Sequence, residues 1–120
     1  MNECVFCKIV KGEIPSYKIW EDDKFYAFLD INPIFPGHTL LIPKKHHNYV
    51  EIMLKAKMLS SRIKTATGSA RVGLAVEGIS VPHLHIHLVP INYVNDLDPC
   101  KAKHATPEEL KEMQEKLRKK

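Results

Sequence analysis

Residues 81–90 read "VPHLHIHLVP", and this stretch places histidine at every second position. Residues two apart in a strand point to the same face of the sheet and lie about 6.6–7 Å apart. His83, His85 and His87 are therefore predicted to share one face, and the apolar residues between them turn toward the core: Leu84, Ile86 and Leu88. Histidine has little intrinsic reason to recur on one strand face. The pattern thus indicates a row of imidazoles held on a rigid support for a function.

Two chemistries can use such a row. In the first, a His-x-His pair binds a metal ion, as in zinc sites where one strand supplies two ligands. In the second, a neutral imidazole is itself the nucleophile, and a neighbour on the same face stabilises charge on the group under attack. An uncharged nitrogen can approach an anionic phosphoryl group without the repulsion that a carboxylate meets. The alternating pattern alone is compatible with both.

The length and composition of the chain predict one domain over residues 1–120. Hydrophobic residues make up 44% of the 120 residues and charged residues 27%, which is the balance of a globular protein. Apolar runs are only a few residues long, so no bilayer-spanning helix is expected. The N-terminal "MNECVFCKIVKGEIP" has no secretory leader pattern, and we expect a cytoplasmic protein. A formal charge of +4 fits a small anionic substrate and does not single out nucleic acid.

The rest of the chain predicts several strands, one main helix, two more strands and a final helix. Clusters of aromatic and β-branched residues separated by polar turn residues indicate the strands. Apolar residues at helical spacing indicate the main helix. The final helix begins with "TPEE", which is a capping box. Short connections favour an α+β fold with a mostly antiparallel sheet of about five strands. The expected strands are residues 16–23, 24–30, 38–43, 71–78 and 82–90, and the expected helices are a short turn at 6–12, the main helix at 49–67 and a helix from Pro107.

Two longer stretches make a specific resemblance. "CVFCKIVKGEIPSYKIWEDDKFYAFLDINPIFPGHTLLIPKKH" and "VPHLHIHLV" resemble the two signature regions of the histidine triad (HIT) family, whose triad alternates histidine with apolar residues. Together with the spacing between them, they account for most of residues 3–90. The resemblance implies a HIT-like α+β fold, a purine nucleotide substrate and a homodimer that pairs through the middle helix and the adjoining strand.

The resemblance also implies roles for individual residues. His85 matches the nucleophile that takes the nucleotidyl group, His87 contacts the phosphate oxygens, and His38 of "PGHT" supports the triad. Asp30 accepts hydrogen bonds from the ribose hydroxyls, a task that suits a carboxylate because it can receive two O–H donors. Ser80 falls where the family places a hydroxyl near the phosphate and leaving group. The positions that match the family's apolar purine pocket are Val5, Phe6, Ile9, Phe28 and Ile31.

The cysteines resemble those of a zinc-carrying, Hint-like branch of the same family. A C-x-x-C in a reducing compartment suggests metal ligation or thiol chemistry more than a disulfide. The resemblance implies a closed site made by Cys4, Cys7, His46 and His83, with His47 as an alternative to His46. Two thiolates and two imidazoles with no open position describe a structural tetrahedral zinc site.

These features lead to one principal hypothesis and two alternatives. The principal hypothesis is a hydrolase that acts at the α-phosphorus of purine nucleoside phosphoramidates or related adenylylated compounds. The alternatives are a dinucleoside polyphosphate hydrolase with the same nucleophile, and a nucleotide- or zinc-binding module with little turnover. A family relative that removes adenylate from DNA ends carries further nucleic-acid-binding elements, and none is evident here. The segment "AVEGISVPH" before the triad is shorter than usual and offers no counterpart to the family's phosphate-side asparagine.

Overall fold

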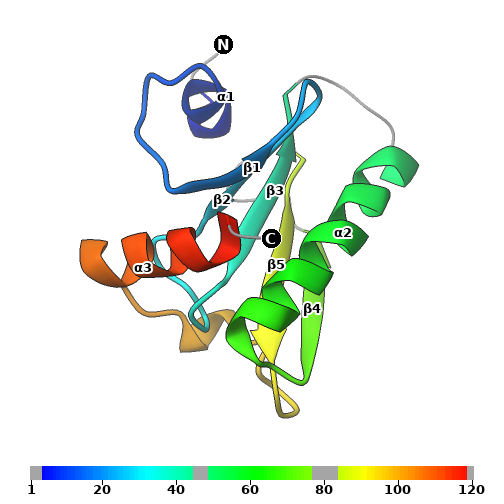
Figure 1. Ribbon diagram of the computed structural model, residues 1–120, viewed down its shortest axis with the longest axis vertical. Helices are drawn as coiled ribbons and strands as arrows, with labels where there is room; N and C mark the ends of the chain where they lie inside the picture. Colours follow the sequence, from blue (N-terminus) through cyan, green and yellow to red (C-terminus); the bar gives the residue numbers. More distant parts are fainter. Residues whose placement is uncertain (1–3, 45–48, 77–83, 119–120) are drawn as a thin grey trace.

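The computed structural model describes residues 4–44, 49–76 and 84–118. Figure 1 shows a twisted sheet with helices on both sides of it. The elements in chain order are α1 (Val5–Val10), β1 (Lys18–Glu21), β2 (Phe25–Leu29), β3 (Thr39–Pro43), α2 (Tyr49–Thr67), β4 (Arg71–Val76), β5 (Ile86–Ile91), the 3₁₀ turn η1 (Pro99–Lys101) and α3 (Pro107–Arg118).

All strand pairs in the sheet are antiparallel, and the spatial order is β1-β2-β3-β5-β4. The connection from β3 to β4 runs through α2, so that β5 can insert between the two strands. This five-stranded arrangement with one long helix and a C-terminal helix confirms the predicted α+β fold.

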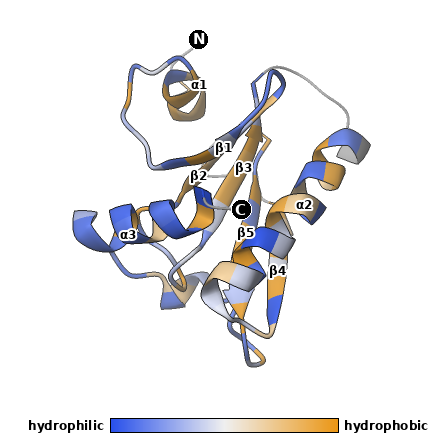
Figure 2. Ribbon diagram, in the orientation of Figure 1, coloured by the Kyte–Doolittle hydropathy of each residue, from blue (hydrophilic) through white to orange (hydrophobic). Residues whose placement is uncertain are grey.

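The two faces of the sheet bury different sets of side chains. Alternate residues of the strands face α2 and α3 and form the larger core, which includes Phe25, Leu41, Ile86 and Leu88. The opposite face packs against α1 in a smaller cluster made by Phe6, Ile9, Tyr26, Phe28, Leu40 and Ile42. Both faces of β2 and β3 are buried as a result, and Figure 2 shows these strands as largely hydrophobic along their length.

Local sequence signals account for the boundaries of several elements. The helix α2 covers the predicted residues 49–67, and α3 begins with the predicted capping box, in which Thr106 and Glu109 each accept a hydrogen bond from the other's backbone N–H. Between β1 and β2, a carboxylate oxygen of Asp22 accepts hydrogen bonds from the N–H groups of Lys24 and Phe25 and fixes the turn.

No helix within residues 4–44, 49–76 and 84–118 has the length and apolar character to cross a membrane.

Residues 77–78 and 82–83 of the predicted strands lie outside the described residues; within the described part, two strands are shorter than predicted by two residues at an end. The strand predicted for residues 82–90 begins only at Ile86 and ends at Ile91, because ladder pairing with β3 and β4 starts at Ile86. The strand predicted for residues 16–23 is reduced to Lys18–Glu21, and its register with β2 shifts between Lys18 and Trp20. The turn η1 was not predicted.

Candidate active site

The site is built where β2, β3 and β5 lie side by side in the sheet. Asp30 directly follows β2, His38 directly precedes β3, and His87 lies in β5 opposite Leu40 of β3. A backbone hydrogen bond from Asp30 N–H to the His38 carbonyl closes the loop of residues 31–37 at its base. The antiparallel pairing therefore brings a carboxylate and two imidazoles from distant parts of the chain to the face that α1 covers.

A chain of hydrogen bonds fixes the protonation of the two imidazoles. The backbone N–H of Ile34 donates to Nδ1 of His38 at 3.0 Å, and Nε2 of His38 lies 2.9 Å from Nδ1 of His87. A backbone N–H can only donate, so Nδ1 of neutral His38 carries no proton and its Nε2–H is the donor to His87. Nδ1 of His87 is then an acceptor. In neutral His87 the ring proton is consequently on Nε2, which makes this nitrogen a donor.

Burial keeps His38 neutral. Desolvation lowers the pKa of His38 to about 4, against a smaller opposing effect of the Asp30 carboxylate and with a further lowering by His87. Asp30 Oδ2 lies 3.6 Å from Nε2 of His38, and the His38 side chain is almost completely buried. At neutral pH His38 is thus uncharged; it accepts a hydrogen bond from the Ile34 N–H and donates one to His87.

This buried histidine predicts a pH dependence of stability. His38 has a pKa of about 4 in the folded protein and about 6.5 when unfolded. The unfolded chain therefore binds the proton more readily, and stability falls as the pH is lowered from about 7 toward 4. Between pH 8 and pH 5 the loss should be about 2 kcal/mol. Urea unfolding of wild type and His38→Gln at both pH values measures it, and an equal pH dependence in both proteins would contradict this origin.

His85 and His87 lie next to each other, as the alternating pattern predicts. Their ring centroids are 5.1 Å apart, and the ring of Phe6 from α1 meets His85 edge to face at a centroid distance of 5.0 Å. His85 is only 2% exposed. The first helix is therefore packed directly against the predicted nucleophile.

The carboxylate of Asp30 is partly exposed and already accepts a hydrogen bond from the β2–β3 loop that follows it. Its Oδ1 accepts a hydrogen bond from the N–H of Asn32 at 2.8 Å. Asp30, His38 and His87 bring three possible metal-ligating atoms within 4.8 Å of one another. The contact between Nε2 of His38 and Nδ1 of His87 has the geometry of a hydrogen bond, and the Ile34 N–H determines that the proton in it belongs to His38. Both of these nitrogens therefore already have a hydrogen-bond partner. The arrangement fits a hydrogen-bonded network better than a set of ligands.

The two N-terminal cysteines are neighbours, and neither forms a disulfide. Burial raises the pKa of the Cys7 thiol, and a hydrogen bond with Cys4 raises it further. Two nearby thiols that are not joined in a disulfide are a suitable donor pair for zinc. The other predicted ligands, His46 or its alternative His47 and His83, lie outside the described residues, as does Ser80.

The five residues predicted for the purine pocket fall into two groups. Phe6, Ile9 and Phe28 are buried in the smaller core cluster, and Phe6 meets Phe28 edge to face. Val5 and Ile31 are exposed, by 37% and 48%. The first group belongs to the core on the face that α1 covers, and the second group presents apolar side chains to solvent.

Sequence reasoning missed the backbone contribution of Ile34. A main-chain N–H leaves no mark in the residue type, and the apolar side chain at this position gives no indication of a role beside His38. The pair of prolines and the glycine in "INPIFPG" predict an irregular loop here, but not which N–H points inward.

Comparisons with known proteins identify the family. The HIT domain model matches residues 11–93, which is more than half of the chain. The chain belongs to the HIT family. An adenosine 5'-monophosphoramidase, HNT1, of Candida albicans is 38% identical, with 72% of this chain and 69% of that enzyme aligned. Adenylylsulfatase HINT3 of Arabidopsis thaliana is 40% identical over 74% of this chain, which spans only about half (52%) of that enzyme.

Solved structures of HIT proteins share the fold. A hypothetical histidine triad nucleotide-binding protein from Sulfolobus tokodaii superposes with a TM-score of 0.79 at 34% identity and covers 96% of this chain and 89% of its own. A zinc-bound histidine triad family protein from Mycobacterium smegmatis has a TM-score of 0.73 at 31% identity, with coverages of 97% and 91%. The HIT assignment thus rests on sequence and on three-dimensional structure.

Proposed function

We propose that this HIT protein hydrolyses purine nucleoside phosphoramidates or related adenylylated compounds at the α-phosphorus. The observation that supports this best is the hydrogen-bonded pair His38–His87 beside His85, because it aims a proton donor at the position next to a neutral nucleophile. Relatives named as a monophosphoramidase and an adenylylsulfatase both act on adenylylated compounds, and they support a hydrolase of this class.

The reaction proceeds through a covalent nucleotidyl-histidine. A ring nitrogen of neutral His85 attacks the α-phosphorus, a nitrogen–phosphorus bond forms, and the bond to the leaving amine or oxygen breaks. The leaving group takes a proton through the triad or Ser80 as it departs, and the water that attacks in the second step returns a proton. Water then attacks phosphorus from the vacated side, the bond to His85 breaks, and the mononucleotide is released. Two easier steps replace one difficult displacement.

His87 is suited to stabilise the phosphoryl group during both steps. Its Nδ1 is engaged by His38, so Nε2–H is the ring group proposed to donate a hydrogen bond to a non-bridging oxygen or to the leaving group. The buried position of His38 keeps this donor in one tautomer. Ser80, for which the resemblance to the family implies a position near the leaving group, is proposed as a second donor.

His85 needs access to its substrate. Because it is 2% exposed and in contact with Phe6, phosphorus can reach its ring only when a covering segment moves. The base is then placed against the exposed apolar side chains Val5 and Ile31, with the buried Phe6, Ile9 and Phe28 behind them.

Asp30 is proposed to bind the ribose hydroxyls. Asp30→Ala should weaken binding of AMP about tenfold or more and should weaken binding of 2',3'-dideoxy-AMP much less, because the analogue lacks the donors. Calorimetric titration of both ligands into both proteins measures the difference. Since Asp30 also holds the N–H of Asn32, Asp30→Asn is the control that keeps this loop contact. Equal losses for the two ligands would remove Asp30 from the ribose role.

Zinc is proposed to be structural, held by Cys4, Cys7, His46 or His47, and His83. When bound, it crosslinks the start of α1 to the triad segment. The protein should contain about one zinc per chain, and Cys7→Ser should lose the metal and at least about 2 kcal/mol of stability while turnover persists. Cys100→Ser is the matched control, because Cys100 is exposed and distant in sequence from the pair. Metal-free protein from a reducing, chelator-free preparation would contradict the assignment.

The alternatives differ in the leaving group or in turnover. A dinucleoside polyphosphate hydrolase uses the same nucleophile, and a binding module has little turnover. Release of AMP from an adenosine phosphoramidate, adenosine 5'-phosphosulfate and a diadenosine polyphosphate distinguishes them. Comparable binding of all three without AMP release would favour the binding module.

The HIT protein is proposed to form a homodimer through α2 and β4. β4 is an edge strand with exposed Leu74 and Val76, and the first half of α2 exposes Met53 and Leu54. Pairing these surfaces would cover an apolar edge that a monomer leaves open. Sedimentation equilibrium should give twice the chain mass of 13.7 kDa, and a monomer at micromolar concentration would contradict the dimer.

A further inference from the structure

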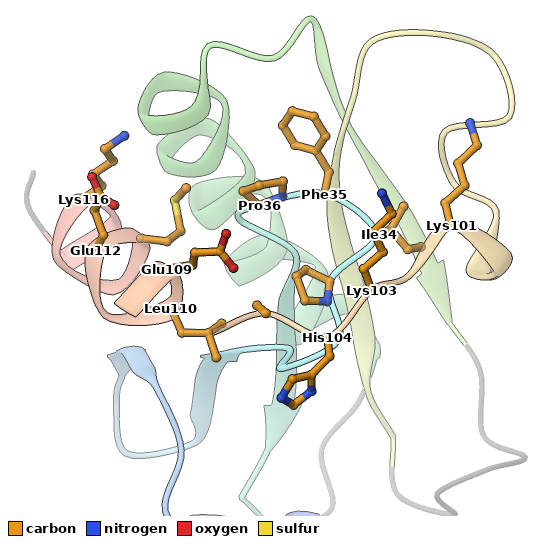
Figure 3. A pocket seen from close by; sticks show the side chains of 13 residues that line it. Ile34, Phe35, Pro36, Lys101, Lys103, His104, Glu109, Leu110, Glu112 and Lys116 are labelled. Carbon is orange, nitrogen blue, oxygen red and sulfur yellow. The ribbon is translucent and has the colours of Figure 1, made fainter. Parts of the chain in front are cut away.

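A second pocket lies away from the triad. It has a volume of about 510 Å³, within the range of small-molecule sites. The loop that follows β2 forms one wall, α3 another, and the segment after η1 a third (Figure 3). The lining includes Ile34, Phe35, Lys103, His104 and Met113, and no lining residue belongs to the triad.

The walls of this pocket combine apolar surface with an uneven distribution of charge. Phe35 is 39% exposed and contributes a large aromatic face to the lining, and α3 contributes the apolar side chains of Leu110 and Met113. On α3, Glu109 is engaged by the N–H of Thr106, and Glu112 stands one turn before Lys116, beside which Figure 3 shows it. The lining thus carries two carboxylates and one ammonium group from α3, and one of these carboxylates already accepts a hydrogen bond from the backbone.

The opposite wall is basic. It carries Lys101, Lys103 and His104 within four residues. Lys101 is paired with Asp96 at 3.1 Å, whereas Lys103 makes no ion pair with any residue in the described part of the chain. Lys103 thus adds a positive charge without an ion pair to a lining that also presents the apolar side chains of Phe35 and Met113, which complements a ligand with one anionic end and one apolar end.

We propose that this pocket binds a small organic anion with an aromatic or aliphatic body. The body lies against Phe35 and Met113, and the anionic group meets Lys103. This ligand differs from a nucleotide substrate in needing neither ribose nor an α-phosphorus.

Hydrogen bonds connect the pocket to the β2–β3 loop, which also supports the active site. Its basic segment is bonded to the β2–β3 loop by Lys103 N–H to Pro33 O, by Ala105 N–H to Ile31 O, and by a 3.1 Å contact between His104 Nδ1 and Asn32 Oδ1. The same loop supplies the Ile34 N–H that determines the tautomer of His38. A ligand that shifts Ile34 therefore acts on His38 and, through it, on His87. This regulatory part rests on the proposed function, whereas the binding part does not.

Binding is tested with indole-3-acetate and its neutral isostere indole-3-acetamide as probes, followed by amide NMR spectra of the wild-type protein. The acetate should shift signals of the β2–β3 loop and of α3, and should bind more tightly than the amide. Lys103→Gln should weaken the acetate about threefold or more and leave the amide unchanged, with Lys111→Gln, on α3 outside the pocket, as control. Equal affinity for the two probes, shifts confined to the triad, or no binding by 10 mM overturns the proposal.

The connection is tested on the imidazole nitrogens. Saturation with indole-3-acetate should move the ¹⁵N signals of His38 in long-range proton–nitrogen spectra and should change the rate of AMP release, and in Lys103→Gln both effects should need about threefold or more higher concentration of the acetate. Unmoved His38 signals in a saturated protein overturn the connection, even if turnover is absent. Moved signals with no AMP release under any condition would instead count against the proposed function.

Discussion

Replacing His85 with asparagine should lower the rate of AMP release by about 10⁴-fold or more, while the fold, the zinc content and nucleotide binding persist. Asparagine keeps a polar side chain but offers no nucleophilic nitrogen. A loss of this size corresponds to about 5 kcal/mol of transition-state stabilisation. Single-turnover assays with an adenosine phosphoramidate measure the effect, and calorimetric titration with AMP shows whether the site still binds.

The covalent intermediate gives this experiment a second readout. Acid-free quenching with radiolabelled substrate should trap a nucleotide on wild-type protein, in a bond that is labile in acid and stable in base, and none on His85→Asn. His87→Asn should still form the adduct, but more slowly, because it removes a donor and not the nucleophile. Turnover of His85→Asn near the wild-type rate, or loss of activity on chelation of a protein that stays folded, would reassign the imidazoles as metal ligands.

The fold and much of the site could be predicted because they depend on side-chain patterns. Alternation at Ile86 and Leu88 places these residues in the larger core and sends His87 to the other face, and the structure confirms both. The resemblance gives His38 a supporting role, and the structure brings it within 2.9 Å of His87. The role of Asp30 toward ribose and of His85 as nucleophile stay predictions.

The remaining features arise from the backbone and from tertiary contacts. The tautomer of His38 depends on one N–H of Ile34, and the second pocket depends on how α3 packs against a loop about 70 residues away in sequence. Neither produces a periodic pattern in the residues concerned. The late start of β5 has the same origin, because the extent of a strand follows from the partners with which it pairs, and pairing with Leu41 of β3 and Val76 of β4 begins at Ile86.

Gly37 is the position where a single methyl group should do the most damage to the fold. Its φ is +104°, a conformation that L side chains rarely adopt, and a Cβ there would lie 2.7 Å from Cγ2 of Thr67 and 3.2 Å from Cγ of Pro90. Thr67 cannot easily turn away, because its hydroxyl donates to the Ile63 carbonyl. Gly37→Ala should therefore lower the free energy of unfolding by about 3 kcal/mol or more, from backbone strain and overpacking together.

Two further variants separate these causes in urea unfolding. Gly68 has φ +69° and no heavy atom within 4 Å of the added Cβ, so Gly68→Ala should cost only about 1 kcal/mol of strain. Thr67→Ser keeps the hydroxyl and removes the methyl group that clashes. In the Gly37→Ala background it should recover about 1 kcal/mol or more, a coupling that a double-mutant cycle measures directly. Because Gly37 immediately precedes His38, the recovered protein should also regain the hydrogen bond to His87. If Gly37→Ala and Gly68→Ala lowered the free energy of unfolding equally, the close approach of Thr67 would contribute nothing to the loss. The loop would then fix His38 through its hydrogen bonds alone.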